Sequence, residues 1–266
     1  MDIDRVKLIY FSPTKTTKKI LDGVAEGIQI DTIAHLDLTF PEARSREFEE
    51  IRDELVIIGT PVYSGRVPLE AVKRLQRLKA TNAPVVVIVV YGNREYEDAL
   101  LELSNLTAEA GFTPFAGGAF IGEHSYSNKS TPIADGRPDG RDIKKAVEFG
   151  RMIQNKIRDI HALTEISPLH VPGNFPYRER AEKLKTSPIT KETLCKTCEQ
   201  CVAVCPTVAI TFKDAVITDQ NVCILCCACV KICPTGARVI EDPQLKQRAE
   251  KLSINYRKRK EPEMYI

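Results

Sequence analysis

The residues of this sequence best suited to chemistry are its nine cysteines, all of which lie between Cys195 and Cys233. Eight of them form two runs with the same spacing, Cys-x2-Cys-x2-Cys-x3-Cys-Pro, and the second run begins 28 residues after the start of the first. Three thiolates on one such tight loop converge on three corners of an iron–sulfur cubane, and the last cysteine of the other run supplies the fourth corner. The spacing therefore predicts two [4Fe–4S] clusters.

This crossed arrangement assigns eight cysteines. The ligands predicted for cluster 1 are Cys195, Cys198, Cys201 and Cys233. The ligands predicted for cluster 2 are Cys223, Cys226, Cys229 and Cys205. Zinc sites are the alternative because they also use Cys-x2-Cys, although they rarely place three cysteines at this spacing before Cys-Pro. The ninth cysteine, Cys227, is interpreted as a small apolar residue packed beside a cluster, with a redox-active thiol as the alternative.

A second candidate site follows the apolar run 6–11, where Ser12, Thr14 and Thr17 place hydroxyl groups ahead of a predicted helix. Hydroxyls and the free N–H groups of a helix start together bind phosphate. The predicted contact residues of this loop are Ser12, Pro13, Thr14, Lys15, Thr16 and Thr17. The loop lacks the glycines of a Walker A motif and of a dinucleotide fingerprint, so neither site is predicted. A simple helix N-cap is the alternative interpretation.

Two further loops follow predicted strands and carry aromatic rings beside hydrogen-bonding groups. In an open α/β sheet, ligands bind beyond the carboxyl ends of the strands, so these loops are expected next to the phosphate loop. The residues expected to contact a flat, polar-edged ring such as isoalloxazine are Pro61, Val62, Tyr63, Tyr91, Gly92, Asn93, Arg94 and Tyr96. For Tyr63 and Tyr96, packing at a turn or helix start is the alternative.

Short apolar strands and amphipathic helices alternate up to about residue 160. The predicted strands are Val6–Phe11, Asp31–Leu36, Leu55–Gly59, Val85–Tyr91 and Phe115–Phe120. The predicted helices are Thr16–Gly27, Arg44–Arg52, Pro68–Leu78, Tyr96–Ala110, Gly140–His161 and a last one from Pro243 to about Tyr256. This alternation predicts an α/β fold, with a doubly wound, five-stranded parallel sheet followed by a small α+β module that holds the cysteines.

Changes in composition divide the chain into four parts. We predict an α/β domain at 1–163, a proline-rich linker at 164–188, the cysteine module at 189–241, and a C-terminal helix with a basic tail at 242–266. The tail, which begins Arg257-Lys258-Arg259-Lys260, is interpreted as a solvated terminus, with a docking site as the alternative.

Both candidate sites resemble those of known families. The duplicated cysteine run resembles bacterial ferredoxins, and the Ser12–Thr17 loop resembles the flavodoxin phosphate loop, with Lys15 in the slot of its glycine. The chain as a whole resembles the EFR1-type fused flavodoxin–ferredoxin proteins of anaerobic bacteria and archaea. The resemblance implies FMN in a flavodoxin-like domain, two [4Fe–4S] clusters in a ferredoxin-like domain, and low-potential electron transfer as the role.

The loop 122–127 also resembles that family, and its His124 has two interpretations, a proton donor to reduced flavin or an ordinary loop histidine. We expect an electron relay between the clusters and FMN, to or from a ferredoxin- or flavoprotein-type redox partner. The alternatives are a flavin oxidoreductase that reduces a small-molecule acceptor and a redox-sensing module.

Several classes of partner are not expected. A net charge of +2 leaves no large basic field for nucleic acid. The longest strongly apolar run, 85–90, is far shorter than the roughly 20 residues of a membrane-spanning helix. The acidic start Met1–Asp4 has no targeting signal, so we expect a cytoplasmic protein.

Overall fold

Five of the apolar runs assemble into one parallel sheet in the computed structural model, which describes residues 4–266. Part of the acidic start, residues 1–3, lies outside the described residues. The parallel strands are β1 (Arg5–Tyr10), β2 (Thr32–Asp37), β4 (Leu55–Pro61), β6 (Pro84–Tyr91) and β7 (Thr113–Ile121). They lie in the order β2-β1-β4-β6-β7, which is the doubly wound order of the flavodoxin-like fold. The predicted fold class of this domain is confirmed.

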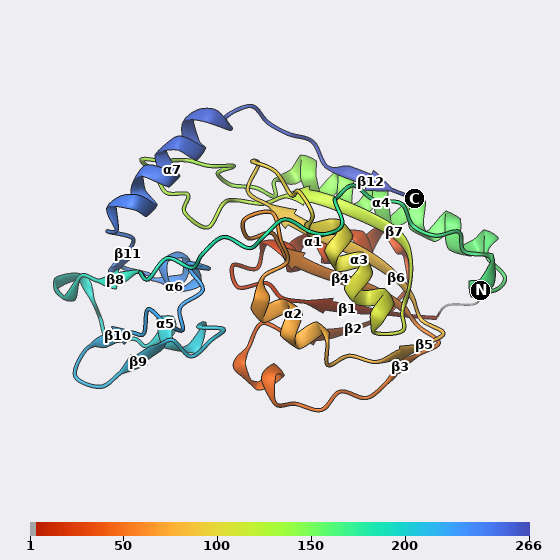
Figure 1. Cartoon of the computed structure of the whole chain (residues 1–266), viewed down its shortest axis with the longest axis horizontal. Helices are drawn as coiled ribbons and strands as arrows, with labels where there is room; N and C mark the ends of the chain where they lie inside the picture. Colours follow the sequence, from red (N-terminus) through yellow and green to blue (C-terminus); the bar gives the residue numbers. More distant parts are fainter. Residues whose placement is uncertain (1–3) are drawn as a thin grey trace.

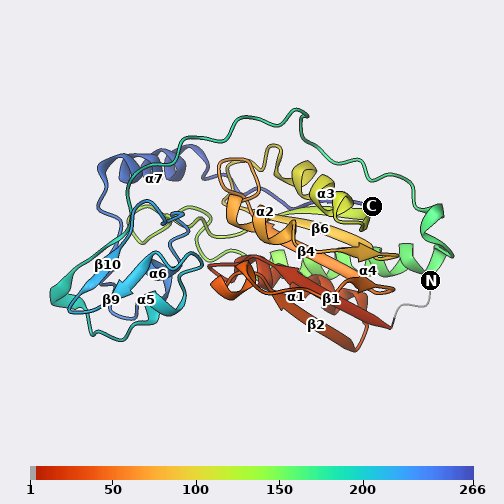
Figure 2. The same ribbon diagram turned by 60° about the horizontal axis from the view of Figure 1, so that its bottom comes forward.

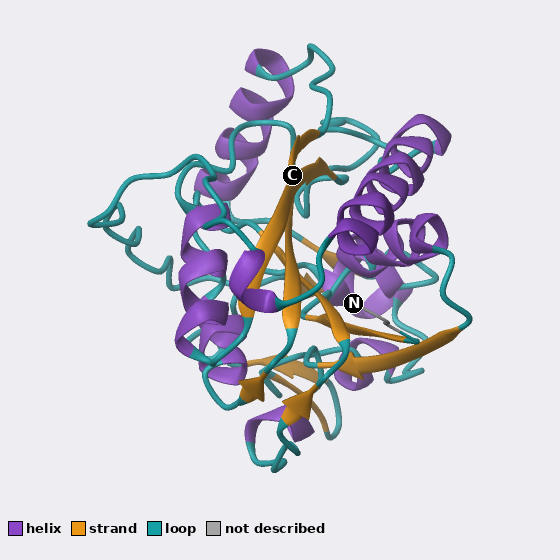
Figure 3. Ribbon diagram, turned by 90° about the vertical axis from the view of Figure 1, so that its right-hand side faces the viewer, coloured by secondary structure: helices purple, strands orange, loops and turns teal. Residues whose placement is uncertain are grey.

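Helices cover both faces of the sheet (Figure 3). Helices α1 (Thr16–Ile28) and α4 (Gly140–Asp159) pack on one face, and α2 (Leu69–Leu75) and α3 (Ala99–Glu109) on the other. Strand β6 is buried along its whole length, as its unbroken β-branched run predicts. Helices α1 and α4 touch at Gly27 and Gly150, where an added Cβ atom would lie 2.1 Å from a carbonyl oxygen of the facing helix. Only glycine permits so close an approach of the two backbones.

The sheet has a sixth strand that the sequence did not reveal. Residues 256–266 run back from the cysteine module to the α/β domain, where β12 (Glu263–Tyr265) pairs antiparallel with the outer edge of β7. The basic tail is tied down as well, because the guanidinium of Arg259 donates to the carboxylates of Asp139 (2.7 Å) and Asp142 (3.0 Å). The interpretation of the tail as a solvated terminus is therefore wrong.

The predicted helix Arg44–Arg52 is also wrong. The segment contains the end of a single 3₁₀ turn, Pro41–Arg44, and ends in β3 (Ile51–Arg52), which pairs with β5 (Ala80–Thr81). Its residues 44–50 are exposed or half-buried, so no apolar stripe is available to hold a helix against the sheet. The other predicted helices form, with ends shifted by up to three residues.

The cysteine module, which lies at one end of the α/β domain (Figure 2), is built from two halves that repeat each other. Its elements are β8 (Ile189–Thr190), η3 (Glu192–Leu194), α5 (Gln200–Ala203), β9 (Ile210–Phe212), β10 (Val216–Thr218), α6 (Ala228–Ile232) and β11 (Arg238–Val239). Strand β8 pairs with β11, and β9 pairs with β10. Left-handed backbone conformations at Thr197, Glu199 and Val208 recur 28 residues later, at positions 225, 227 and 236. The duplication in sequence is therefore a duplication in backbone geometry.

Two segments join the module to the α/β domain (Figure 1). The linker leaves α4 through a 3₁₀ turn, Leu163–Glu165, and is fixed by Asp98, whose carboxylate accepts from the backbone N–H groups of Asn174 (2.9 Å) and Arg178 (2.7 Å). The return segment contains α7 (Pro243–Asn255) and the tail. Within residues 4–266, no helix is both long and apolar enough to cross a membrane.

Candidate functional site

One cavity of about 1280 Å³ lies beyond the carboxyl ends of β1, β4, β6 and β7. The loops that follow these four strands form one side of the cavity, which is the position where ligands bind in doubly wound sheets. The opposite side comes from linker residues 178 and 180–184, residues 221–225 of the second cysteine run, and two residues of α7. The cavity therefore lies between the α/β domain and the cysteine module.

The Ser12–Thr17 loop closes tightly onto the start of α1. Lys15 adopts the left-handed conformation (φ +64°) that glycine takes most readily, and it immediately precedes α1. The loop closes through the Lys15 N–H, which donates to the Ser12 carbonyl (3.0 Å), and through the Lys18 N–H, which donates to the Ser12 hydroxyl (3.1 Å). The Ser12 hydroxyl thus satisfies one N–H of the first turn of α1, whose N-cap residue is Lys15.

Two threonines of this loop reach the cavity. Thr14 and Thr16 line it, and their hydroxyl oxygens lie 3.3 Å apart. The other loop residues expected to contact a ligand do not line the cavity: Ser12, Pro13, Lys15 and Thr17. The hydroxyl of Thr17 is fully buried and has no hydrogen-bond partner within residues 4–266. Because a phosphate needs several donors, the set that fits best is the Thr14 and Thr16 hydroxyls with the first-turn N–H groups of α1.

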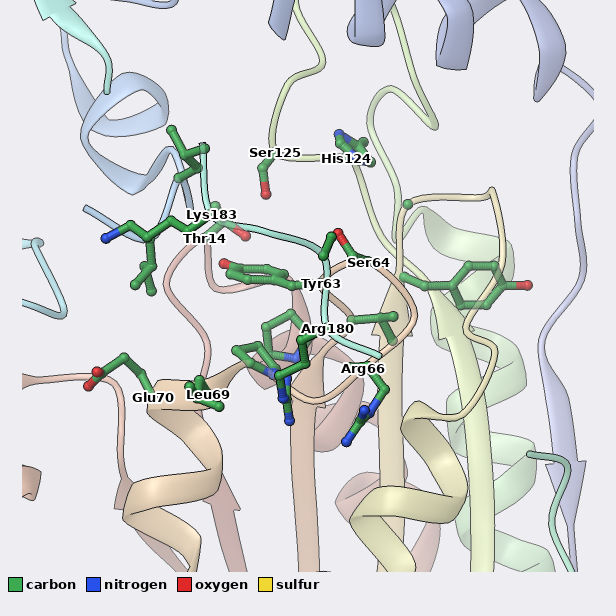
Figure 4. Close-up of a pocket in the computed structure, with 18 of the residues that line it drawn as sticks. Thr14, Tyr63, Ser64, Arg66, Leu69, Glu70, His124, Ser125, Arg180 and Lys183 are labelled. Atoms are coloured by element: carbon green, nitrogen blue, oxygen red, sulfur yellow. The ribbon is translucent and has the colours of Figure 1, made fainter. Parts of the chain in front are cut away.

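Aromatic and polar groups surround the middle of the cavity. In Figure 4 the Tyr63 ring lies between Ser125 and His124 on one side and Arg66 and Arg180 on the other. The expected contacts Pro61, Val62, Tyr91, Gly92 and Arg94 line the cavity as well. Burial, and then the nearby thiols of the second cysteine run, raise the pKa of the Tyr63 hydroxyl, which is therefore neutral at pH 7.

Asn93 and Tyr96, also expected to contact the ring, do not line the cavity. The amide nitrogen of Asn93 donates to the carbonyls of Tyr256 (2.7 Å) and Lys258 (2.9 Å). The Tyr96 hydroxyl lies 2.8 Å from both the Glu263 carboxylate and the Tyr265 hydroxyl. Both side chains hold the C-terminal segment in place, which a local sequence pattern does not reveal.

His124 lines the cavity in its neutral form. Burial, followed by the charges of Lys231 and Arg94, lowers its pKa to about 4. Its Nδ1 atom accepts the backbone N–H of Tyr126 (3.1 Å), so the ring proton is expected on Nε2. A neutral imidazole with its proton on Nε2 can donate a hydrogen bond to a group in the cavity.

The structure brings the four cysteines predicted for cluster 1 together. Cys195, Cys198 and Cys201 of the first run and Cys233 of the second line one small cavity inside the module. Burial raises the pKa of the Cys201 thiol, and Cys195 is among the charges that act on it. The crossed contribution of Cys233 is the arrangement that the spacing predicts.

The four cysteines predicted for cluster 2 also lie close together. Burial raises the pKa of the Cys226 thiol, and the thiols of Cys229, Cys223 and Cys205 raise it further, so Cys205 of the first run lies among the cysteines of the second. Among residues 4–266, no three His, Cys, Asp or Glu side chains converge closely enough to hold a single metal ion. In a cubane each thiolate binds a different iron atom, so its ligands stand wider apart than those of one ion.

Donor groups aimed at the sulfurs suit an iron–sulfur centre. The Ala209 N–H donates to Cys205 Sγ (3.2 Å), the Leu225 N–H to Cys223 Sγ (3.4 Å), and the Arg238 guanidinium to Cys229 Sγ (3.6 Å). Such hydrogen bonds stabilise thiolate ligands and tune the potential of a cluster. Cys227 differs, because its own thiol donates to the Leu225 carbonyl (3.5 Å) and the residue is 1% exposed.

Parts of the cavity wall were not expected from the sequence. The linker residues 180–184 and the α7 residues Arg248 and Leu252 line it, although the sequence marks them only as proline-rich and helical. A cluster of positive side chains on and near α2 was missed too. Their clustering in sequence, at positions 73, 74 and 77, was the only signal available.

Comparisons with known proteins bear on both parts of the chain. Residues 216–239 match the family described as a 4Fe-4S binding domain. No curated protein matches the chain. The similar solved structures include a flavodoxin from the domain Archaea, at 12% identity and a TM-score of 0.36, which covers 58% of this chain and 99% of that one. A Streptococcus pneumoniae flavodoxin has 15% identity and a TM-score of 0.39, and covers 57% of this chain and 99% of that one.

A longer protein is also similar over the same region. The rubredoxin oxygen:oxidoreductase of Desulfovibrio gigas has 14% identity and a TM-score of 0.40, and the match covers 58% of this chain and 36% of that one. The family match covers the whole second cysteine run and its flanking strands β10 and β11, so it supports the predicted 4Fe–4S site there.

Proposed function

We propose that this chain is an electron-transfer protein that holds FMN in the 1280 Å³ cavity and two [4Fe–4S] clusters in its cysteine module. One observation carries the proposal: Thr14 and Thr16 of the phosphate loop and Cys223 of the second cysteine run line the same cavity. A flavin bound through its phosphate at the loop would therefore share a wall with the ligands of cluster 2. The clusters would supply single electrons and the flavin would accept one or two.

The side chains of the cavity would divide the work of binding. Thr14, Thr16 and the start of α1 would hold the phosphate through neutral donors and the helix dipole. Tyr63 and Tyr126 line the cavity near the thiols of Cys226 and Cys227, so their rings would contact a flavin bound there. Burial keeps both phenols protonated at pH 7.

The two cysteine sets have different exposure, which supports an order for the relay. Cys223 lies in the wall of the flavin cavity, whereas Cys198 is exposed to solvent and belongs to the set predicted for cluster 1. We infer that a redox partner of the ferredoxin or flavoprotein type meets the protein at the loop around Cys198. Cluster 2 would then connect cluster 1 with the flavin.

A flavin oxidoreductase that reduces a small-molecule acceptor is the second candidate. The observation that favours it is the size of the cavity, since pockets for one small ligand usually measure about 300–1,000 Å³. A carrier that only exchanges electrons with proteins needs no room beyond the flavin.

The test is anaerobic reconstitution of the full chain, with iron and sulfide analysis and titration by FMN and by riboflavin, which lacks the phosphate. We expect iron for two cubanes, and FMN bound at least tenfold more tightly than riboflavin, because one charge-assisted hydrogen bond contributes about 1.5–3 kcal/mol. Replacement Thr14→Ala or Thr16→Ala should reduce the difference in affinity between FMN and riboflavin. Thr32→Ala, at the opposite end of the sheet, is the matched control.

Two outcomes would contradict the proposal. Equal affinity for FMN and riboflavin would show that the Ser12–Thr17 loop does not bind the FMN phosphate. An iron content sufficient for only one cubane would show that one of the two predicted clusters does not form. Transfer between the centres is measured separately, by reducing the clusters with a limiting amount of donor and following flavin absorbance.

A further inference from the structure

Four basic side chains lie at the α2 end of the cavity, and three of them contact one carboxylate. Arg44 lies 3.0 Å, Arg74 3.5 Å and Lys73 3.6 Å from the carboxylate oxygens of Glu70, measured from the nearest side-chain nitrogen. Arg77 lies one turn further along, and its guanidinium donates to the backbone carbonyl of Arg46 (3.1 Å). Arg44, Lys73, Arg74 and Arg77, called here the α2 cation cluster, all line the cavity together with Glu70.

The α2 cation cluster carries more positive charge than Glu70, its one ion-pair partner among residues 4–266, although Asp37 also acts on Arg74. Three of its members share Glu70, and Arg77 contacts only a carbonyl oxygen. Arg74 is 1% exposed and is fixed by the carbonyls of Thr39 (2.6 Å) and Pro206 (2.6 Å), so its charge cannot move away. The side chain of Lys73 is 64% exposed and free to meet a ligand. Positive charges held this close together favour an anion.

Several other basic residues of the cavity are paired with carboxylates. Arg66 and Arg180 both bind the carboxylate of Glu102 (2.8 and 2.6 Å), and Arg94 binds Glu97 (2.7 Å). The phosphate of FMN, by the proposal above, lies at Thr14 and Thr16. Lys183 and Arg248 also line the cavity, but the α2 cation cluster is the place where four basic side chains lie within one short segment and its neighbour.

Apolar side chains lie next to this charge. Leu69 precedes Glu70 at the start of α2 and is 49% exposed, and Figure 4 shows both residues beside the cavity. Val222 of the cysteine module is 36% exposed and lines the cavity together with Leu184 of the linker. Exposed apolar groups beside exposed cations suit a molecule with an apolar body and an anionic head.

We propose that the α2 end of the cavity binds a small organic anion beside the flavin, with its carboxylate or phosphate on Lys73 and Arg77 and its apolar part against Leu69 and Val222. The inference rests on the proposed function, because it assigns FMN to the remainder of the cavity. It identifies the acceptor of the second candidate function as a carboxylate or a phosphate ester.

The experiment uses the full chain reconstituted with clusters and FMN, and isothermal titration with three probes of one ring and different head groups. Benzoate carries a carboxylate, phenyl phosphate carries a phosphate, and benzamide is neutral. We expect at least one anion to bind about tenfold or more tightly than benzamide. The variant Lys73→Gln/Arg77→Gln should remove most of that difference, and the control Lys79→Gln, which removes a charge next to α2 but outside the cavity wall, should keep it.

Each outcome decides the inference. Tighter binding of benzoate identifies a carboxylate head, and tighter binding of phenyl phosphate a phosphate head. Equal affinity for the three probes, or an unchanged difference in Lys73→Gln/Arg77→Gln, overturns it. FMN retention is read from absorbance in the same samples, so loss of FMN from the unmodified protein counts against the proposed function. If FMN is lost, the three probes are titrated into the chain that holds only the clusters. Equal affinities for the three probes in that sample still overturn the proposed anion site.

Discussion

Arg238 offers a direct test of the two-cluster arrangement, because it contacts both halves of the cysteine module. The residue is 2% exposed, and its guanidinium donates to the hydroxyls of Thr190 (2.8 Å) and Thr218 (2.9 Å) and to Cys229 Sγ (3.6 Å). Arg238 also lines the small cavity formed by the four cysteines predicted for cluster 1. A buried positive charge therefore lies between the two predicted clusters.

Replacement Arg238→Gln removes this charge and keeps hydrogen-bonding groups. A unit charge about 6 Å from a cluster contributes on the order of 3 kcal/mol at an effective dielectric constant of about 20. For a one-electron couple, in which 59 mV is one decade of equilibrium constant, that energy corresponds to roughly 130 mV. Reduction adds one negative charge to a cluster, so the loss of the cation should lower the midpoint potentials of both clusters by about this amount.

The assay is an anaerobic redox titration followed by EPR, with iron analysis of every sample. Arg238→Lys keeps the charge and should restore most of the potential. Lys213→Met removes an exposed charge from the turn between β9 and β10, and should shift the potentials by less than about 20 mV because water and salt screen it. Unchanged potentials in Arg238→Gln with full iron content would refute the placement of Arg238 between two clusters.

Four further predictions follow from the structure. Cys205→Ala should damage the EPR signal of cluster 2 and spare that of cluster 1; the reverse result would disprove the crossed ligation. Cys227→Ala should leave iron and sulfide content unchanged, since its thiol bonds only to a carbonyl, and loss of half the iron would mean that the ligand register is wrong. Asn93→Ala should lower the free energy of unfolding by about 1–3 kcal/mol, because buried polar groups of the C-terminal segment lose their partner. Asn93→Gly should lower the free energy of unfolding less than Asn93→Ala does, because glycine tolerates the left-handed backbone at this position. An equal decrease in the two variants would show that backbone strain does not contribute. Finally, His124 binds a proton below about pH 6.5 when unfolded but only below about pH 4 when folded, so stability should fall as the pH drops from 6.5 to 4. Denaturant unfolding of His124→Gln should show a shallower fall over this range, and an identical slope would contradict the buried neutral imidazole.

The parallel sheet and the cysteine grouping could be predicted from the sequence because both depend on local patterns. The β-branched run at 85–90 favours a strand buried on both faces, and it forms the interior of β6. The equal spacing of the two cysteine runs places Cys233 with Cys195, since the repeat itself defines which corner each half leaves open.

The errors arose where distant contacts decide the structure. Strand β12 has only three residues, and it forms because the edge of β7, more than 140 residues earlier, is available for pairing. Tyr96 and Asn93 look like ligand contacts by their place after a strand, yet their partners are in the same distant segment. Local sequence carries no signal for such pairing, because the loss of entropy on closing the loop is offset only by contacts with the finished domain.

The return of the chain to β7 makes the cysteine module an insertion in the α/β domain and not a domain appended to it. The first and the last described strands, β1 and β12, belong to one sheet. Two segments connect this sheet to the module, namely the linker and the return segment that contains α7. A module on a single flexible linker would meet the carboxyl end of the sheet at an effective concentration in the millimolar range. Here the second connection keeps the module beside the cavity even when the first is cut. A protease that cleaves the exposed linker near residues 179–183 would therefore leave both fragments in one particle, with the module still held through β12.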